Sequence, residues 1–288
     1  MEWKRGIEMK HLIIVRGGGE LATGVIHCLY RAGFRVLALE KALPTATRRR
    51  VAFSDAMYRG KMTVERVTCY KAESLEEAKK RLKNGDVVML DDPAGKCIEK
   101  LSPAVVIDAI TGKHNYGTNR AMAPHTIALG AGFCAGRDVD TVVEIARGHN
   151  LGRLIYEGYS AKDDRSNGYV GVDRNIEHLV FAPVGGTVDV LRTISQVVKK
   201  GESIAHIHGE DGSIVEIRAT IDGVLRGAVH SGSEVEKGQR IADIHPTMGQ
   251  EECFTISDKA RCIGGSVLED VMAWWHASHH RRGFLSRL

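Results

Sequence analysis

The sequence lacks several features that would assign it to a particular class of protein. It contains no run of 18 apolar residues, which argues against a membrane-spanning helix. Its first residues, MEWKRGIEMKH, are polar and contain no apolar signal-peptide core, so we expect a cytoplasmic protein without a membrane partner. Aromatic residues make up only 6% of the chain and the net charge is +4. Little surface is available for stacking on bases, so we expect no nucleic-acid partner.

The chain also lacks paired cysteines. Its six cysteines are scattered and include no C-x-x-C pair, which argues against a structural zinc site and against a disulfide framework. We therefore predict no metal site. We expect most of these cysteines to be small buried side chains.

The most informative stretch is residues 11–40, HLIIVRGGGELATGVIHCLYRAGFRVLALE. An apolar run at 12–15 precedes three glycines, and a helical pattern of apolar residues then leads to Gly33. A second apolar run at 36–39 ends on Glu40. This order predicts a strand, a tight turn, a helix and a second strand, with G-x-G-x-x-A spacing at the turn.

That spacing is typical of dinucleotide-binding folds. A first glycine permits the turn, a second lets a pyrophosphate approach the backbone, and the amide groups at the helix start attract phosphate. An acid about 20 residues later usually binds a ribose hydroxyl, which favours NAD. We therefore predict cofactor binding by Gly17, Gly18, Gly19, Glu20, Ala22 and Glu40. The alternative is a purely structural glycine turn.

A basic cluster follows the second strand. Thr45 lies in a predicted turn, and Arg48, Arg49 and Arg50 come directly after it. In a doubly wound sheet this place is the carboxyl edge, where ligands bind, and guanidinium groups bind phosphates in a bidentate manner. We predict that Thr45, Arg48 and Arg49 contribute to the cofactor site. A solvated basic turn is the alternative.

Further polar residues follow later strands. Asp91 and Asp108 end two predicted strands and are candidates for a catalytic base, although each carboxylate is equally suited to cap a turn. Lys113 is a further candidate for catalysis, and His114 and Asn115 could reach a bound anion. No familiar dehydrogenase constellation is present, so the sequence leaves open whether the protein is an enzyme.

A second glycine-rich loop, GAGFCAG, follows the predicted strand 125–129. We predict that Gly130, Gly132 and Gly136 help to bind the cofactor and that a helix over 139–147 follows them. Cys134 would then lie beside helix amide groups, which makes it a candidate for a reactive thiol. The alternative is a small residue that merely fits the loop.

Two segments of the second half repeat each other. Residues 182–208 match residues 219–245 at nine of 27 positions, where chance gives about two. The repeat resembles the biotinyl/lipoyl-carrier fold, a barrel-sandwich hybrid with pseudo-twofold halves. That carrier function needs a lysine on the hairpin between the halves, and no lysine occurs between Gly201 and Lys237. We therefore predict no covalently attached biotin or lipoate.

Together these patterns predict an α/β protein with a Rossmann-like, doubly wound parallel sheet, a small all-β barrel and a C-terminal helix. The predicted parts are a nucleotide-binding domain at 1–157, a linker at 158–177, the barrel at 178–248 and a helical segment at 249–288. We expect the last segment to pack back on the first domain or to form a dimer contact.

Five stretches carry a family resemblance: RGGGELATG, PTATRRRVAFSDAMYRG, GAGFCAGRDVDTVVE, RGHNLGR and FTISDKARCIGG. They resemble the YqeB-type family, described as accessory factors of selenium-dependent molybdenum hydroxylases. The resemblance implies a role in the maturation of a molybdenum hydroxylase, with that enzyme or its maturation machinery as partner. NAD or a molybdopterin dinucleotide would be the cofactor. Two alternatives are an NAD-dependent oxidoreductase and a non-catalytic nucleotide-binding scaffold. We also expect a homo-oligomer.

Overall fold

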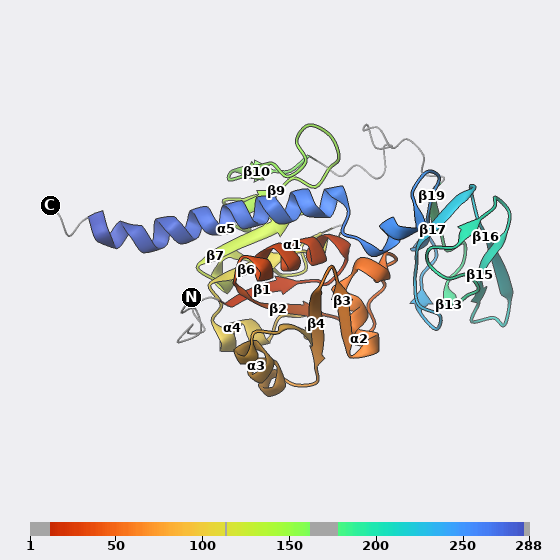
Figure 1. The fold of residues 1–288 in the computed structure, drawn as a ribbon, viewed down its shortest axis with the longest axis horizontal. Coiled ribbons are helices and arrows are strands. Elements are labelled where there is room, and N and C mark those ends of the chain that lie inside the picture. The colour runs from red at the N-terminus through yellow and green to blue at the C-terminus, as the bar shows by residue number, and fades with distance from the viewer. Residues whose placement is uncertain (1–11, 113, 162–177, 285–288) are drawn as a thin grey trace.

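The computed structural model of the chain describes residues 12–112, 114–161 and 178–284, and Figure 1 shows that they form two parts. The larger part is an α/β unit that includes the long C-terminal helix α5. The smaller part consists of strands from the second half of the chain. No helix in the described ranges combines the length and the apolar character needed to cross a membrane.

A nine-stranded sheet lies at the centre of the larger part, in the order β10-β9-β7-β6-β1-β2-β5-β4-β3. The strands are β1 (Leu12–Arg16), β2 (Arg35–Glu40), β3 (Lys61–Val64), β4 (Val67–Ala72), β5 (Val87–Asp91), β6 (Val105–Asp108), β7 (His125–Leu129), β9 (Thr141–Val143) and β10 (Leu154–Ile155). A separate two-stranded ribbon joins β8 (Cys134–Ala135) to β11 (Gly158–Tyr159).

Helices cover both faces of this sheet. On one face, α1 (Glu20–Arg31) and α5 (Asp258–Phe284) pack against residues such as Ile13 and Val15. On the other, α3 (Leu75–Asn84) and α4 (Cys97–Leu101) pack against Leu12 and Ile14. Since β1 is apolar throughout, it suits burial on both faces. The shorter helical segments are η2 (Arg49–Val51), η3 (Phe53–Asp55), α2 (Ala56–Arg59), η4 (Arg120–Met122) and η6 (Gln250–Phe254).

The prediction of a doubly wound parallel sheet is wrong. Both edge strands, β3 and β10, pair antiparallel with their neighbours, so the sheet is mixed. The connection from β7 to β9 contains no helix, because the predicted helix 139–147 is instead the buried strand β9 and a turn. Thr141, Val142 and Val143 are all β-branched and fully covered, which favours a strand.

Helix α5 crosses α1 at very short range. A Cβ added at Gly264 would lie 2.6 Å from the Gly24 carbonyl oxygen, and a Cβ added at Gly24 would lie 2.3 Å from the Ala260 carbonyl oxygen. Gly264 and Gly265 both lie within continuous helix. Gly264 is therefore explained by packing between the two helices.

The smaller part is a sandwich of two four-stranded antiparallel sheets, ordered β12-β19-β17-β14 and β16-β15-β13-β18. The strands are β12 (Leu179–Phe181), β13 (Gly186–Val190), β14 (Val197–Val198), β15 (Ser203–His208), β16 (Ile214–Arg218), β17 (Gly223–Ala228), β18 (Glu234–Val235) and β19 (Arg240–His245). The prediction of a barrel is wrong, because no pairing between the described strands joins the two sheets.

The sequence repeat appears in this sandwich as two equivalent halves. Strands β13 to β15 correspond to β17 to β19, and the equivalent glycines make equivalent close approaches. A Cβ at Gly186 would lie 2.2 Å from the His208 carbonyl oxygen, and one at Gly223 would lie 2.4 Å from the His245 carbonyl oxygen. Each half also contributes a strand that pairs with the other half. Strand β14 of the first half pairs with β17 of the second, and β18 of the second half pairs with β13 of the first.

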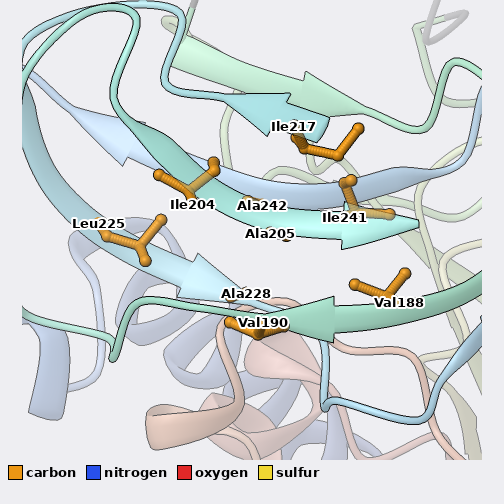
Figure 2. A pocket seen from close by; sticks show the side chains of 9 residues that line it. All are labelled: Val188, Val190, Ile204, Ala205, Ile217, Leu225, Ala228, Ile241 and Ala242. Atoms are coloured by element: carbon orange, nitrogen blue, oxygen red, sulfur yellow. The ribbon is translucent and has the colours of Figure 1, made fainter. Parts of the chain in front are cut away.

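The interior of the sandwich is closely packed. Figure 2 shows the apolar side chains from both sheets that line a small internal space of about 10 Å³. That volume is about the minimum for one water molecule, and an apolar lining offers no partner for water. This space in the sandwich core is therefore too small for a ligand.

Candidate functional site

The glycine turn after β1 is tight, as predicted, but it is filled by the chain itself. Gly17 has a φ of +103°, and its N–H donates to the Leu39 carbonyl at 2.7 Å. Segment η3 lies against the next glycine, because the Ser54 N–H donates to the Gly18 carbonyl at 2.8 Å. A Cβ at Gly18 would lie 2.5 Å from the Met89 side chain. Of the three glycines, Gly19 alone faces open space.

Glu40 is bound to that turn. Its carboxylate accepts the Gly18 N–H at 2.9 Å and the Lys41 N–H at 2.9 Å. Burial raises the pKa of Glu40, and these two hydrogen bonds oppose the rise. A protein carboxylate therefore takes the place in which a ligand anion would meet the turn. The predicted role of Glu40 in holding a ribose finds no support in this arrangement.

Side chains in the first turn of α1 also form contacts within the chain. Glu20 forms an ion pair with Arg48. The Thr23 hydroxyl donates to the Gly19 carbonyl at 2.9 Å and accepts the Phe53 N–H at 2.8 Å. Ala22 is fully buried in the core between α1 and the sheet.

The arginine cluster reaches the sandwich rather than an open anion site. Arg48 also lies 3.5 Å from the Glu252 carbonyl, and Arg49 Nε donates to the Ala228 carbonyl at 3.0 Å. Burial lowers the pKa of Arg49. The Arg50 guanidinium lies 6.0 Å from the centre of the Phe254 ring. These side chains hold the two parts of the protein together.

A second polar contact joins the two parts beside this cluster. Asp55, which is buried, accepts a hydrogen bond from His230 Nε2 at 2.5 Å and pairs with Arg59 at 2.6 Å. The His230 ring lies on Tyr58, with 4.0 Å between ring centres. None of these four residues is among the predicted site residues, because nothing in a single sequence relates position 55 to position 230.

The acids at the ends of the parallel strands differ in environment. Asp108 lies in a buried cluster beneath the loop that follows β6: it accepts the Thr118 hydroxyl at 2.6 Å and the Ile110 N–H at 3.1 Å, and lies 3.8 Å from Arg16. Burial raises the pKa of Asp108, against the effect of these partners. Asp91, by contrast, is exposed at the end of β5.

Arg16 closes the crevice between β1 and β6, where open α/β sheets usually bind ligands. Its guanidinium donates to the Thr118 hydroxyl and to the Pro93 carbonyl at 2.8 Å. Asn115 caps the same loop by accepting the Gly117 and Thr118 amides. His114 is exposed beside Tyr116, while Lys113 lies outside the described residues.

The second glycine-rich loop does not lead into a helix, so the predicted helix there is wrong, while cofactor binding by the glycines of this loop stays a prediction. Gly130, Gly132 and Gly136 all have positive φ, as turns require. Gly130 packs on Ile145, and Gly132 packs on the backbone at His114. Cys134 lies in the short strand β8, with its sulfur 3.7 Å from the Ala135 carbonyl. All six cysteines are free thiols.

An open groove of about 790 Å³ lies where the sandwich meets the loop after β2. Its α/β wall contains Lys41 and Thr45. Its sandwich wall is built from the segments that surround the hairpin after β15 and the strand β18. These are Val184, Gly185, Gly186, Gly209, Glu210, Asp211, Ser213, Glu234, Val235, Glu236, Lys237 and Gln239. Of the predicted cofactor residues, only Thr45 lines this groove.

The sequence of the chain is similar to that of a curated protein. No family model matches it. It is 41% identical over 265 residues to the uncharacterized protein YqeB of Escherichia coli, a match that covers 92% of this chain and 48% of YqeB. The chain thus spans about half the length of the curated relative that it matches.

Three solved structures to which the chain is similar have low TM-scores. A succinylglutamate desuccinylase/aspartoacylase from Rhodobacter sphaeroides is 15% identical with a TM-score of 0.26, covering 82% of this chain and 88% of that one. An aspartoacylase family protein from Mesorhizobium loti is 10% identical with a TM-score of 0.29, covering 82% and 85%. TcdA (CsdL) is 13% identical with a TM-score of 0.32, covering 93% and 89%. At these scores no activity carries over to this chain.

The predicted functions are therefore corrected. The turn predicted to bind a dinucleotide is instead in contact with the chain itself, because η3 bonds to the Gly18 carbonyl and Glu40 accepts the Gly18 N–H. The predictions of an accessory role, an oxidoreductase and a nucleotide-binding scaffold are withdrawn, because each required a dinucleotide at this turn. The resemblance to YqeB-type proteins is confirmed: the chain is a relative of YqeB and corresponds to about half of it.

Proposed function

We propose that the protein is a binding protein that holds a basic polypeptide segment of a partner in the groove between its two parts. The observation that carries this proposal is the charge of the groove. Its lining contains four carboxylates and two ammonium groups, namely Glu210, Asp211, Glu234, Glu236, Lys41 and Lys237. An excess of acidic groups in a concave surface attracts ligands of positive charge.

Two of these carboxylates are available to a partner. Glu210 and Glu236 are exposed, and within the described ranges neither side chain forms an ion pair or accepts a hydrogen bond. Asp211 remains ionised over a wide pH range, because hydrogen bonds from Ser213 lower the pKa of its carboxyl group. Lys41 is partly engaged, since its ammonium group donates to Thr45 at 3.3 Å.

The size of the groove also supports the proposal. About 790 Å³ is within the range of sites that take small molecules, but those sites are mostly apolar and enclosed. This groove is open and only about half of its lining surface is apolar, which suits the side chains of a segment that lies across it. The proposal is also consistent with the α/β part, where Glu40 and Arg16 occupy the places in which such sheets usually bind small ligands.

The proposal is tested with a labelled tetralysine peptide as probe, by fluorescence anisotropy at low ionic strength. The variant Glu210→Gln/Glu236→Gln removes two charges from the groove. Each exposed ion pair contributes about 0.2–1 kcal/mol, so binding should weaken about two- to thirtyfold. Added salt should weaken binding to the wild type, since exposed charges are screened.

The matched control is Glu99→Gln/Glu157→Gln, which removes two exposed carboxylates elsewhere and changes the net charge equally. It should bind tetralysine as the wild type does, and tetraglutamate should bind to neither. Equal losses in the groove variant and the control would show attraction to the whole protein rather than to the groove. That result, or no binding of tetralysine at low salt, would contradict the proposal.

A further inference from the structure

The contact between Tyr58 and His230 is placed to fix both walls of the groove. Tyr58 lies in the short helix α2 of the α/β part, and His230 lies in the loop between β17 and β18 of the sandwich. Their rings overlap, with 4.0 Å between centres and 35° between planes. The His230 ring is also held by the buried carboxylate of Asp55 at 2.5 Å.

From Tyr58 the contact continues to the α/β wall. The Tyr58 hydroxyl donates to the Pro44 carbonyl at 2.9 Å. Pro44 is buried and directly precedes Thr45, which lines the groove and accepts a hydrogen bond from Lys41. The position of the Tyr58 ring therefore determines where this wall lies.

From His230 the contact continues to the sandwich wall. The Ser233 N–H donates to the His230 carbonyl at 3.2 Å, and the next residue, Glu234, begins β18 and lines the groove. The Gly232 N–H donates to the Val188 carbonyl at 2.7 Å, and the Val188 N–H donates to the Ser233 carbonyl at 2.9 Å. The end of this loop next to β18 is therefore held against β13, and the turn from His230 to Ser233 links the position of His230 to β18.

We infer that Tyr58 and His230 form a joint that sets the width of the groove, with both acting as positioning residues rather than as contacts to the partner. The inference rests on the proposed function only in taking the groove as the binding site. Other contacts between the two parts, such as the one from Arg49 to Ala228 and the close approach of Gly227 to Thr47, lie outside the groove lining. They keep the parts together when the joint is removed.

The test measures the distance between the two walls directly. Spin labels are attached through p-acetylphenylalanine at positions 43 and 236, because the native thiols would react with cysteine-directed labels. Leu43 is 67% exposed and Glu236 is exposed, so both positions tolerate a label. Because the label replaces a groove carboxylate at position 236, tetralysine affinities are measured on the unlabelled proteins. Double electron–electron resonance should give a narrow distance distribution for the full chain.

Tyr58→Ala and His230→Ala should broaden or shift this distribution and weaken tetralysine binding about two- to tenfold, the range expected for loss of an aromatic pair. Tyr58→Phe keeps the ring but loses the bond to Pro44, so it should have a smaller effect of the same kind. Tyr70→Ala is the matched control, because Tyr70 packs on Arg81 away from the groove. It should leave the distances unchanged.

The outcomes separate the joint from the proposed function. Unchanged distances in folded Tyr58→Ala and His230→Ala proteins would overturn the inference. If either protein fails to fold, Tyr58→Phe decides, and an unchanged distribution and affinity there would also overturn it. Broader distances with no tetralysine binding in any variant or in the wild type would support the joint and contradict the proposed function.

Discussion

The crossing of α1 and α5 gives a sharp prediction, because two adjacent glycines should respond to alanine with opposite signs. In Gly264→Ala the new methyl group would lie 2.6 Å from the Gly24 carbonyl oxygen and 2.8 Å from the Cys28 sulfur. In Gly265→Ala it would meet nothing within 4 Å, since that residue faces solvent. Both positions lie in the same continuous helix.

The magnitudes follow from two opposing effects. Alanine in place of glycine stabilises a helix interior by about 0.8–1 kcal/mol at either position. Overpacking typically costs about 1–3 kcal/mol, and at Gly264 the obstacle is backbone, which cannot rotate away. We therefore expect Gly265→Ala to be stabilised by up to about 1 kcal/mol. Gly264→Ala should be destabilised by up to about 2 kcal/mol.

The assay is urea unfolding of the two variants and the wild type, followed by far-UV circular dichroism, with fits to the midpoint and slope. The slopes should agree, so that differences in midpoint report differences in stability. A Gly264→Ala protein as stable as Gly265→Ala would refute the close crossing of the helices. A destabilised Gly265→Ala would refute the assignment of its face to solvent.

Three further predictions concern individual side chains. Glu40 has a raised pKa in the folded protein, so its contribution to stability is greatest at low pH and is lost as the pH rises above the ordinary glutamate pKa of about 4.3. In urea titrations, the stability of Glu40→Gln relative to that of the wild type should therefore increase between pH 4 and 7. A constant difference in stability would contradict this. Arg16→Leu leaves the Asp108 carboxylate buried without its cation and should cost about 3–5 kcal/mol, whereas the double variant Arg16→Leu/Asp108→Leu should recover part of that loss. Ser74→Ala removes the hydroxyl that caps α3 through the Glu77 N–H at 3.2 Å and should lower stability by about 1 kcal/mol; a change of less than a few tenths would mean that the cap is not needed.

Local patterns in the sequence predicted the local elements of the fold. The strand, turn and helix of residues 12–31 form where the apolar periodicity indicated. The helix predicted over 139–147 failed because a short apolar run fits either period, and its β-branched residues favour a strand.

The candidate site failed for a different reason. The acid at the end of β2 has the spacing of a ribose ligand, but the same carboxylate can reach the Gly18 amide of its own chain. The basic cluster at 48–50 lies at the edge where ligands usually bind, yet its partners lie some 180 to 200 residues later, as with Arg49 and Ala228. Contacts across such separations leave no trace in local composition or spacing.

The exchange of strands between the two repeated halves has a consequence for how the sandwich arises. A peptide with only residues 182–208 would lack the neighbour that pairs with β14, and one with only 219–245 would lack the neighbour that pairs with β18. Neither copy can complete a sheet by itself. A single repeat could bury its apolar face only by associating with a second molecule of the same kind, so the covalent tandem replaces what would otherwise be a strand-swapped dimer.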